Sequence, residues 1–214
     1  MEVKELNHED TKTRRESGTS RVGARTSVGR EGGAQSRSIS LKVGLVALVC
    51  LTCQDIYGGS LDAVVETVSQ LHPVAGIDAS GLSDSASVSV KRVVIFDVRE
   101  VGEFDTSHLK GAVRVDPDVG PDAFLKQYGE LLKDRTAVFY CSVGYRSSLL
   151  VERLVDATGD STNLVNLRGG IFKWYNEGLA VYDSAGATDE IHPFSVAWGR
   201  LLEKRAGKKN VPVP

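Results

Sequence analysis

The stretch Val138-Phe139-Tyr140-Cys141-Ser142-Val143-Gly144-Tyr145-Arg146-Ser147-Ser148 carries the strongest structural signal in the chain. An apolar run ends at Cys141, a short loop with a central glycine follows, and apolar residues then recur at helical spacing. This order predicts a strand, a tight loop and a helix, with Cys141 at the carboxyl end of the strand. Open parallel sheets carry their binding sites at that end. We therefore expect a functional site around Cys141.

The loop surroundings favour a negatively charged sulfur. Loop N–H groups and the N-terminus of the following helix can stabilise an anion there, and a thiol in such a field becomes a nucleophilic thiolate. An isolated cysteine is more often a small buried hydrophobe, but Cys141 opens a glycine-containing turn that closes on Arg146. Cys141 is therefore predicted to be the catalytic residue. The predicted active loop comprises Ser142, Val143, Gly144, Tyr145, Arg146 and Ser147.

Strand and helix signals alternate on both sides of this loop. Short apolar runs predict strands at residues 93–98, 112–115, 136–141 and 163–167. Helical spacing predicts helices at residues 60–71 (with Ser60 as N-cap), 122–132 and 147–157. A loop or insertion is expected at residues 76–89, and a helix that packs on the domain is expected at 193–205. This alternation indicates an α/β fold, with an open parallel sheet flanked by helices.

The loop resembles the active-site loop of the rhodanese family, and three other stretches resemble that family's motifs in the same order. They are residues 93–100, which contain Asp97-Val98-Arg99, residues 103–112 (Glu-Phe-Asp-Thr-Ser-His-Leu-Lys-Gly-Ala) and residues 167–174 (Leu-Arg-Gly-Gly-Ile-Phe-Lys-Trp). The resemblance covers residues 60 to 183. One departure is Ser107, which stands where the family usually has glycine.

The resemblance implies a sulfurtransferase. Cys141 would take a sulfane sulfur from thiosulfate or a persulfide donor and become a persulfide. It would then pass the sulfur to a nucleophilic acceptor, such as a thiol, cyanide or an acceptor protein. The spacing Cys-x4-Arg is shorter than the Cys-x5-Arg cradle of phosphatase and arsenate-reductase relatives, so sulfur transfer is favoured over those activities. A catalytically weak rhodanese-like binding or regulatory module is the alternative.

The sequence also suggests roles for the other motif residues, with two alternatives for Arg146 and for Arg99. Arg146 either binds an anionic donor or pairs with a carboxylate that holds the loop. Asp97 is expected to support the loop by accepting its N–H bonds, while Arg99 could serve either role. His108 is expected to be a hydrogen-bonded packing residue and Trp174 a core residue. Gly111, Gly169 and Gly170 are expected to hold special backbone conformations.

Composition separates the chain into four parts. They are a disordered, basic, Ser/Gly-rich segment (residues 1–42), a short apolar segment (43–57), the rhodanese-like domain (60–183) and an extension with a helix and a basic tail (184–214). The chain has 214 residues and a net charge of −2, so its overall charge makes no case for nucleic acid as a partner. No cofactor is expected, and the four histidines show no metal-ligand spacing.

The apolar segment bears on localisation. Residues 43–53 are too short to span a bilayer, which needs about twenty residues, but they suit the core of a targeting signal after basic residues. A buried strand or helix is the competing interpretation. A secreted, membrane-targeted or organellar location is favoured over a cytoplasmic one, and membrane association of the protein is left open. Cys50 and Cys53 are expected to be apolar filler, with a role in resolving a Cys141 persulfide left open, and three cysteines argue against a disulfide framework.

Overall fold

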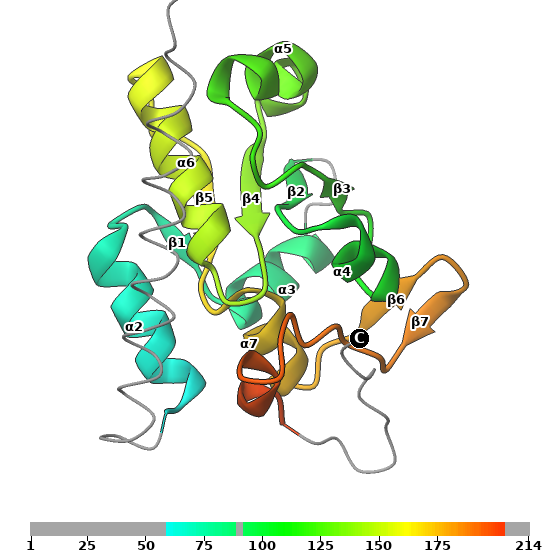
Figure 1. Ribbon diagram of the computed structural model, residues 1–214. Coiled ribbons are helices and arrows are strands. Elements are labelled where there is room, and N and C mark those ends of the chain that lie inside the picture. Colours follow the sequence, from blue (N-terminus) through cyan, green and yellow to red (C-terminus); the bar gives the residue numbers. More distant parts are fainter. Residues whose placement is uncertain (1–58, 89–91, 204–214) are drawn as a thin grey trace, which may run out of the picture. The chain divides into compact units, whose positions relative to one another are not determined.

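A five-stranded parallel sheet forms the centre of the computed structural model, which describes residues 59–88 and 92–203 (Figure 1). Its strand order is β1-β5-β4-β2-β3. The strands are β1 (Gly76–Ile77), β2 (Val93–Asp97), β3 (Val113–Arg114), β4 (Thr136–Tyr140) and β5 (Leu164–Leu167). The predicted α/β class and parallel sheet are confirmed. Segments 1–42 and 43–57 and the basic tail lie outside the described residues.

Strand β4 is buried on both faces, which explains its unbroken apolar run. Val138 and Tyr140 lie in one core cluster, while Ala137 and Phe139 lie in the other, because successive side chains of a strand point to opposite faces. Helices α5 (Pro121–Leu132) and α6 (Tyr145–Thr158) pack in the Phe139 cluster. Helices α2 (Leu61–Leu71), α3 (Ala79–Val88) and α7 (Gly170–Asn176) pack in the Val138 cluster.

Helix α2 illustrates how local sequence sets an element. The Ser60 side chain accepts a hydrogen bond from the Ala63 N–H at 3.3 Å, which satisfies one open donor of the first turn. Val64 and Val68, one helical turn apart, are the buried positions. The predicted helix and its N-cap are both confirmed.

Two segments differ from the prediction. Residues 76–89 were expected to form a loop or an insertion without regular structure assigned to it, but they hold β1 and α3. Strand β1 forms because Gly76 and Ile77 pair with Asn166 and Leu167 of β5, a long-range contact that a run of small residues does not reveal. Helix α3 buries Leu82 completely.

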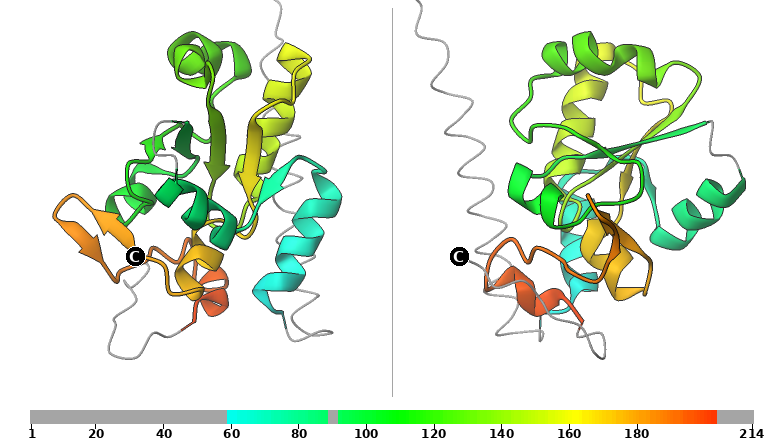
Figure 2. Two further views of the ribbon diagram at one scale, coloured as in Figure 1. Left: turned by 180° about the vertical axis from the view of Figure 1, so that it is seen from behind. Right: turned by 90° about the vertical axis from the view of Figure 1, so that its right-hand side faces the viewer.

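The prediction of a helix at residues 193–205 is also wrong. Phe194 has a φ of +62°, outside the helical region, so only a short 3₁₀ helix, η1 (Trp198–Leu201), forms. The antiparallel hairpin of β6 (Val181–Asp183) and β7 (Gly186–Thr188), and the short helix α4 (Val101–Thr106), were not anticipated (Figure 2). Within residues 59–88 and 92–203, no helix has both the length and the apolar character needed to cross a membrane.

Candidate functional site

Cys141 lies between the carboxyl end of β4 and the N-terminus of α6, where the sequence predicted it. Its thiol is free, and 1% of the residue is exposed. The Gly144 N–H points back at the Cys141 Sγ at 3.3 Å. Gly144 adopts a φ of +96°, and a Cβ there would meet the Asn166 Nδ2 at 3.2 Å. Glycine is therefore needed to turn this amide toward the sulfur.

Asn166, on the neighbouring strand β5, holds the loop through side-chain hydrogen bonds. Its Nδ2 donates to the Gly144 carbonyl at 3.1 Å, and its Oδ1 accepts from the Ser147 Oγ at 2.7 Å. One buried amide thus ties the loop to the first turn of α6. Asn166 was not among the predicted site residues, because its pairing across the sheet joins residues that lie far apart in the chain.

The first turn of α7 holds the other side of the loop. The Ile171 N–H donates to the Cys141 carbonyl at 2.9 Å, and the Phe172 N–H donates to the Ser142 carbonyl at 3.0 Å. A Cβ at Gly170 would overlap the backbone of Cys141 and Ser142. Gly169 and Gly170 were expected to hold special backbone conformations, and they have φ values of +75° and +55°. At Gly170 the backbone of Cys141 and Ser142 also lies too close for a side chain to fit.

Arg146 is paired with a buried carboxylate, which was one of its two predicted roles. Its Nη1 and Nη2 donate to the two Glu103 carboxylate oxygens, each at 2.8 Å. The Ser142 Oγ donates to Glu103 at 2.8 Å and accepts from the Arg146 Nη2 at 3.0 Å. Glu103 lies on α4, so this triad fastens the loop to that helix. Glu103 belongs to a quoted motif, but no role was predicted for it.

The charges of this triad shift one another's pKa. Burial tends to raise the pKa of Glu103, but the hydrogen bonds and charges of Arg146, the charge of Arg99 and the Ser142 hydrogen bond together lower it below its usual value. For Arg146, burial tends to lower the pKa, but the Glu103 hydrogen bonds and the charges of Cys141 and Glu103 raise it. Arg146 therefore stays protonated and Glu103 ionised at neutral pH.

Asp97 and Arg99 form a second, fully buried pair beneath the site. Arg99 donates to both Asp97 carboxylate oxygens at 2.8 and 2.7 Å, and its Nη2 also donates to the Ser107 carbonyl at 2.6 Å. The Tyr140 hydroxyl donates to Asp97 at 2.5 Å and accepts from the Leu109 N–H. Asp97 was expected to accept loop N–H bonds. Instead its carboxylate accepts from the side chains of Arg99 and Tyr140.

Asp97 shifts the pKa values of Tyr140 and of its own partner, Arg99. Burial raises the pKa of Tyr140 well above its usual value, and the neighbouring negative charge of Asp97 raises it further. Burial opposes the charge of Arg99, but the charge and hydrogen bonds of Asp97 outweigh it and raise the pKa of Arg99. Arg99 is fully buried and supports the strand ends, which leaves it out of reach of a ligand.

Two predicted loop residues point into the protein. Val143 and Tyr145 are both buried and belong to the Val138 cluster. The Tyr145 ring meets the His72 ring edge-on at 5.2 Å, and the His72 Nδ1 lies 2.8 Å from the Glu152 carboxylate. Burial, then the charge of Glu152, raises the pKa of Tyr145. These side chains anchor the loop, and so they do not line its opening.

His108 and Trp174 were assigned packing roles. The His108 Nδ1 donates to the Phe104 carbonyl at 3.0 Å, and its ring stacks on the Phe104 ring at 4.0 Å. Trp174 is partly buried against the core, and its Nε1 donates to the Ala180 carbonyl at 2.9 Å. Both side chains make packing contacts that hold the chain around the sheet.

Phe194 is another site contact that the sequence did not reveal. Its ring covers the Arg146 guanidinium, with 5.0 Å between the central carbon and the ring centroid. It lies in the chain segment that follows the β6–β7 hairpin, about fifty residues from Arg146. Only the three-dimensional path of that segment brings the two side chains together.

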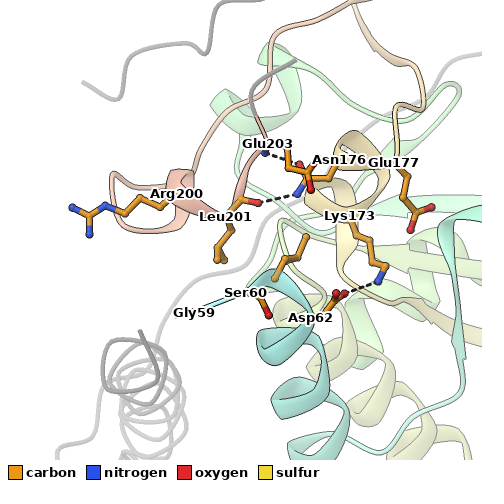
Figure 3. Close-up of a pocket in the computed structure, with 10 residues that line it drawn as sticks. Gly59, Ser60, Asp62, Lys173, Asn176, Glu177, Arg200, Leu201 and Glu203 are labelled. Atoms are coloured by element: carbon orange, nitrogen blue, oxygen red, sulfur yellow. Dashed lines mark hydrogen bonds and ion pairs between the residues drawn. The ribbon is translucent and has the colours of Figure 1, made fainter. Parts of the chain in front are cut away.

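A pocket of about 380 Å³ lies elsewhere, between the start of α2, the end of α7 and η1 (Figure 3). Lys173 pairs with Asp62 across it at 2.8 Å, and Asn176 bonds the Leu201 carbonyl and the Glu203 N–H. Cys141 does not line it. The Asn176 contacts fasten residues 201–203 to α7, and the Lys173–Asp62 pair joins α7 to α2. Among the described residues, no group of three or more His, Cys, Asp or Glu side chains is placed to hold a metal ion.

Residues 84–177 match the family model of the rhodanese-like domain. The chain thus contains a rhodanese-like domain, and the resemblance of the four motifs is confirmed at the level of the family.

Several known proteins are similar to this chain. The Mycobacterium tuberculosis protein named "Probable adenylyltransferase/sulfurtransferase MoeZ" is 32% identical over 89 residues, which cover 40% of this chain and 21% of that protein. YqhL of Bacillus subtilis is 32% identical over 85 residues, which cover 39% of this chain and 62% of YqhL. The crystal structure of the Pseudomonas aeruginosa thiosulfate sulfurtransferase matches 71% of this chain and 29% of its own, with 20% identity and a TM-score of 0.45.

Proposed function

We propose that the protein is a sulfurtransferase that carries a sulfane sulfur on Cys141. The observation that carries this proposal is the hydrogen bond from the Gly144 N–H to the Cys141 Sγ, at the N-terminus of a fourteen-residue helix. An inward-facing amide and the helix dipole favour a negative charge at that point. Both the attacking thiolate and the persulfide formed from it carry that charge.

The reaction needs a nucleophile and an anion-stabilising loop. The Cys141 thiolate attacks the outer sulfur of the donor, the donor S–S bond breaks, and the leaving group departs with the bonding electrons. With thiosulfate, the products are sulfite and the Cys141 persulfide anion. Cyanide, a thiol or an acceptor protein then attacks the outer sulfur and restores the thiolate. Total charge is conserved in each step, so neither a proton transfer nor a cofactor is required.

The loop's supports fit this role, because they fix its shape without occupying the sulfur. Asn166 and the first turn of α7 bind loop carbonyls, while Glu103 and Arg146 bind Ser142. The Gly144 N–H remains directed at Sγ. Preorganised donors of this kind stabilise charge without rearrangement during the reaction.

Intact-mass spectrometry tests the proposal. The protein is incubated with thiosulfate or a persulfide donor, and then with cyanide. We expect a gain of one sulfur atom that cyanide discharges as thiocyanate, and no such gain in Cys141→Ser. The double variant Cys50→Ser/Cys53→Ser is the matched control, since it removes the other two cysteines and should still take up sulfur. Uptake that persists in Cys141→Ser would refute the proposal.

A second candidate is a rhodanese-like binding or regulatory module with little catalysis. The observation that favours it is the 1% exposure of Cys141, which restricts access to the thiol. The same experiment separates the two functions. Absence of an adduct with every donor, in a protein that is folded, would support the binding module.

A further inference from the structure

Both arginines of the candidate site are already neutralised. Arg146 uses three donor contacts, two to Glu103 and one to Ser142. Arg99 is fully buried against Asp97. The four residues between Cys141 and Arg146 are uncharged. A dianion such as thiosulfate would therefore meet paired cations, and the carboxylates would offset much of their attraction.

An aromatic side chain covers the cation that lies nearest to solvent. Arg146 is 19% exposed, and the Phe194 ring lies on the face of its guanidinium. Phe194 remains 42% exposed, although a phenyl ring gains by burial. We call Arg146 and Phe194 the rim of the loop. The exposed part of this rim is thus largely apolar.

The position of Phe194 is fixed by its segment. The Trp198 ring packs edge-on against it, with 6.4 Å between the ring centroids. Two hydrogen bonds of Asn176, on α7, anchor Leu201 and Glu203 just beyond (Figure 3). Phe194 lies beyond residue 177, where the match to the rhodanese-like domain ends. This part of the rim therefore lies outside the matched residues.

On the basis of the sulfur-transfer function proposed above, we propose that Phe194 selects sulfur donors that carry one negative charge and an apolar body over dianionic thiosulfate. Cys141 is almost completely buried, and its charge acts on Arg146, so the rim lies near the sulfur. In this proposal the donor approaches the sulfur past the rim. An apolar group on the donor would pack against the exposed ring as the sulfane sulfur enters the loop. Thiosulfate has no apolar group and gains nothing from that contact.

Thiosulfonates provide matched probes, because they differ from thiosulfate in one substituent. Benzenethiosulfonate and methanethiosulfonate are monoanions that carry the same sulfane sulfur on a sulfonyl group. The Cys141 thiolate attacks this sulfur, the S–S bond breaks, and a sulfinate leaves with the electron pair, in place of the sulfite that leaves from thiosulfate. Cyanide discharges the same Cys141 persulfide in every case.

The test measures kcat/KM for the three donors by thiocyanate release, in the wild type, Phe194→Ala and Phe194→Leu. The readout is the ratio of the benzenethiosulfonate value to the thiosulfate value, so differences in intrinsic reactivity cancel between proteins. An aromatic contact of this kind predicts that the ratio falls about tenfold in Phe194→Ala and less in Phe194→Leu. The methanethiosulfonate ratio should fall less than the benzenethiosulfonate ratio.

Val196→Ala is the matched control. Val196 is 70% exposed on the same segment and has no contact with Arg146 among the described interactions, so its ratio should equal that of the wild type. An unchanged ratio in Phe194→Ala would overturn the inference. If kcat/KM also fell equally for all three donors, Phe194 would have a structural role alone. If wild-type protein accepts sulfur from none of the donors, the proposed function itself fails and takes this inference with it.

Discussion

Glu103 and Arg146 form a two-point ion pair that joins helix α4 to the first turn of α6, with both N–O distances at 2.8 Å. The residues are 43 positions apart in the chain. Glu103 is buried, and it also accepts a hydrogen bond from Ser142, the residue after Cys141. The pair therefore couples the stability of the domain to the shape of the loop.

Removal of the Glu103 charge should destabilise the protein. Glu103→Gln leaves Arg146 without its counter-charge, and breaking a buried pair costs about 3 kcal/mol, reduced here because Arg146 is partly exposed. We expect a loss of about 2 kcal/mol in the free energy of unfolding, measured in urea. Glu130→Gln is the control, because its pair with Lys133 is exposed and should contribute less than about 0.5 kcal/mol. Equal losses in the two variants would contradict this account.

The same carboxylate should contribute to acid sensitivity. The folded-state pKa of Glu103 lies below its unfolded-state value, so the folded state favours the ionised form. Its stabilisation is complete above the unfolded-state pKa of about 4.3 and is lost as the pH falls through the folded-state pKa. The free energy of unfolding of wild-type protein should thus fall more steeply below about pH 4 than that of Glu103→Gln. Parallel acid limbs in urea titrations at several pH values would count against the assignment.

Ser107 and Ser147 are both fully buried serines with opposite hydrogen bonding. The Ser107 Oγ has no hydrogen-bond partner among the described residues, whereas the Ser147 Oγ donates to Asn166. Ser107→Ala removes an unsatisfied polar group, so we expect it to be neutral or to stabilise the protein by about 1 kcal/mol. Ser147→Ala should destabilise it by about 1 to 2 kcal/mol, because Asn166 then loses a partner. Thermal or urea unfolding of the two variants would check the contrast, and a large loss in Ser107→Ala would reveal a partner for that hydroxyl.

Local patterns were enough to predict the central strands and the helices that follow them. The run from Thr136 to Tyr140 and the turn at Gly144 encode the strand and loop within a dozen residues, because burial on both faces requires an unbroken apolar strand. The boundary of α6 was placed two residues late, since Tyr145 and Arg146 were read as loop. Their side chains instead begin the helix while they complete the loop.

Features that depend on long-range contacts could not be predicted from the sequence. Strand β1 exists through its pairing with β5, and the roles of Asn166 and Phe194 follow from how distant segments meet. Arg146 is an intermediate case. The sequence could offer two roles for it, but only the position of α4 brings the Glu103 carboxylate within hydrogen-bonding distance.

Gly144 and Gly111 allow the contribution of the loop conformation to be separated from backbone strain. Both have a positive φ, +96° and +73°, so alanine at either position costs about 1 kcal/mol of strain. A Cβ at Gly111 would meet no atom within 4 Å, whereas at Gly144 it would press against Asn166 and the carbonyl of Leu167. Gly111→Ala should therefore lose stability alone, with normal sulfur uptake by Cys141.

Gly144→Ala should lose more stability and also slow sulfur uptake, because relief of the contact with Asn166 turns the Gly144 N–H away from the Cys141 Sγ. Loss of one such donor predicts a decrease of about a hundredfold in the uptake rate. Single-turnover mass spectrometry with a sulfur donor measures that rate, and urea unfolding measures the stability of the same samples. Equal uptake rates in the two variants would mean that the Gly144 amide does not act on the sulfur, and the anion-stabilising role of the loop would have to be given up.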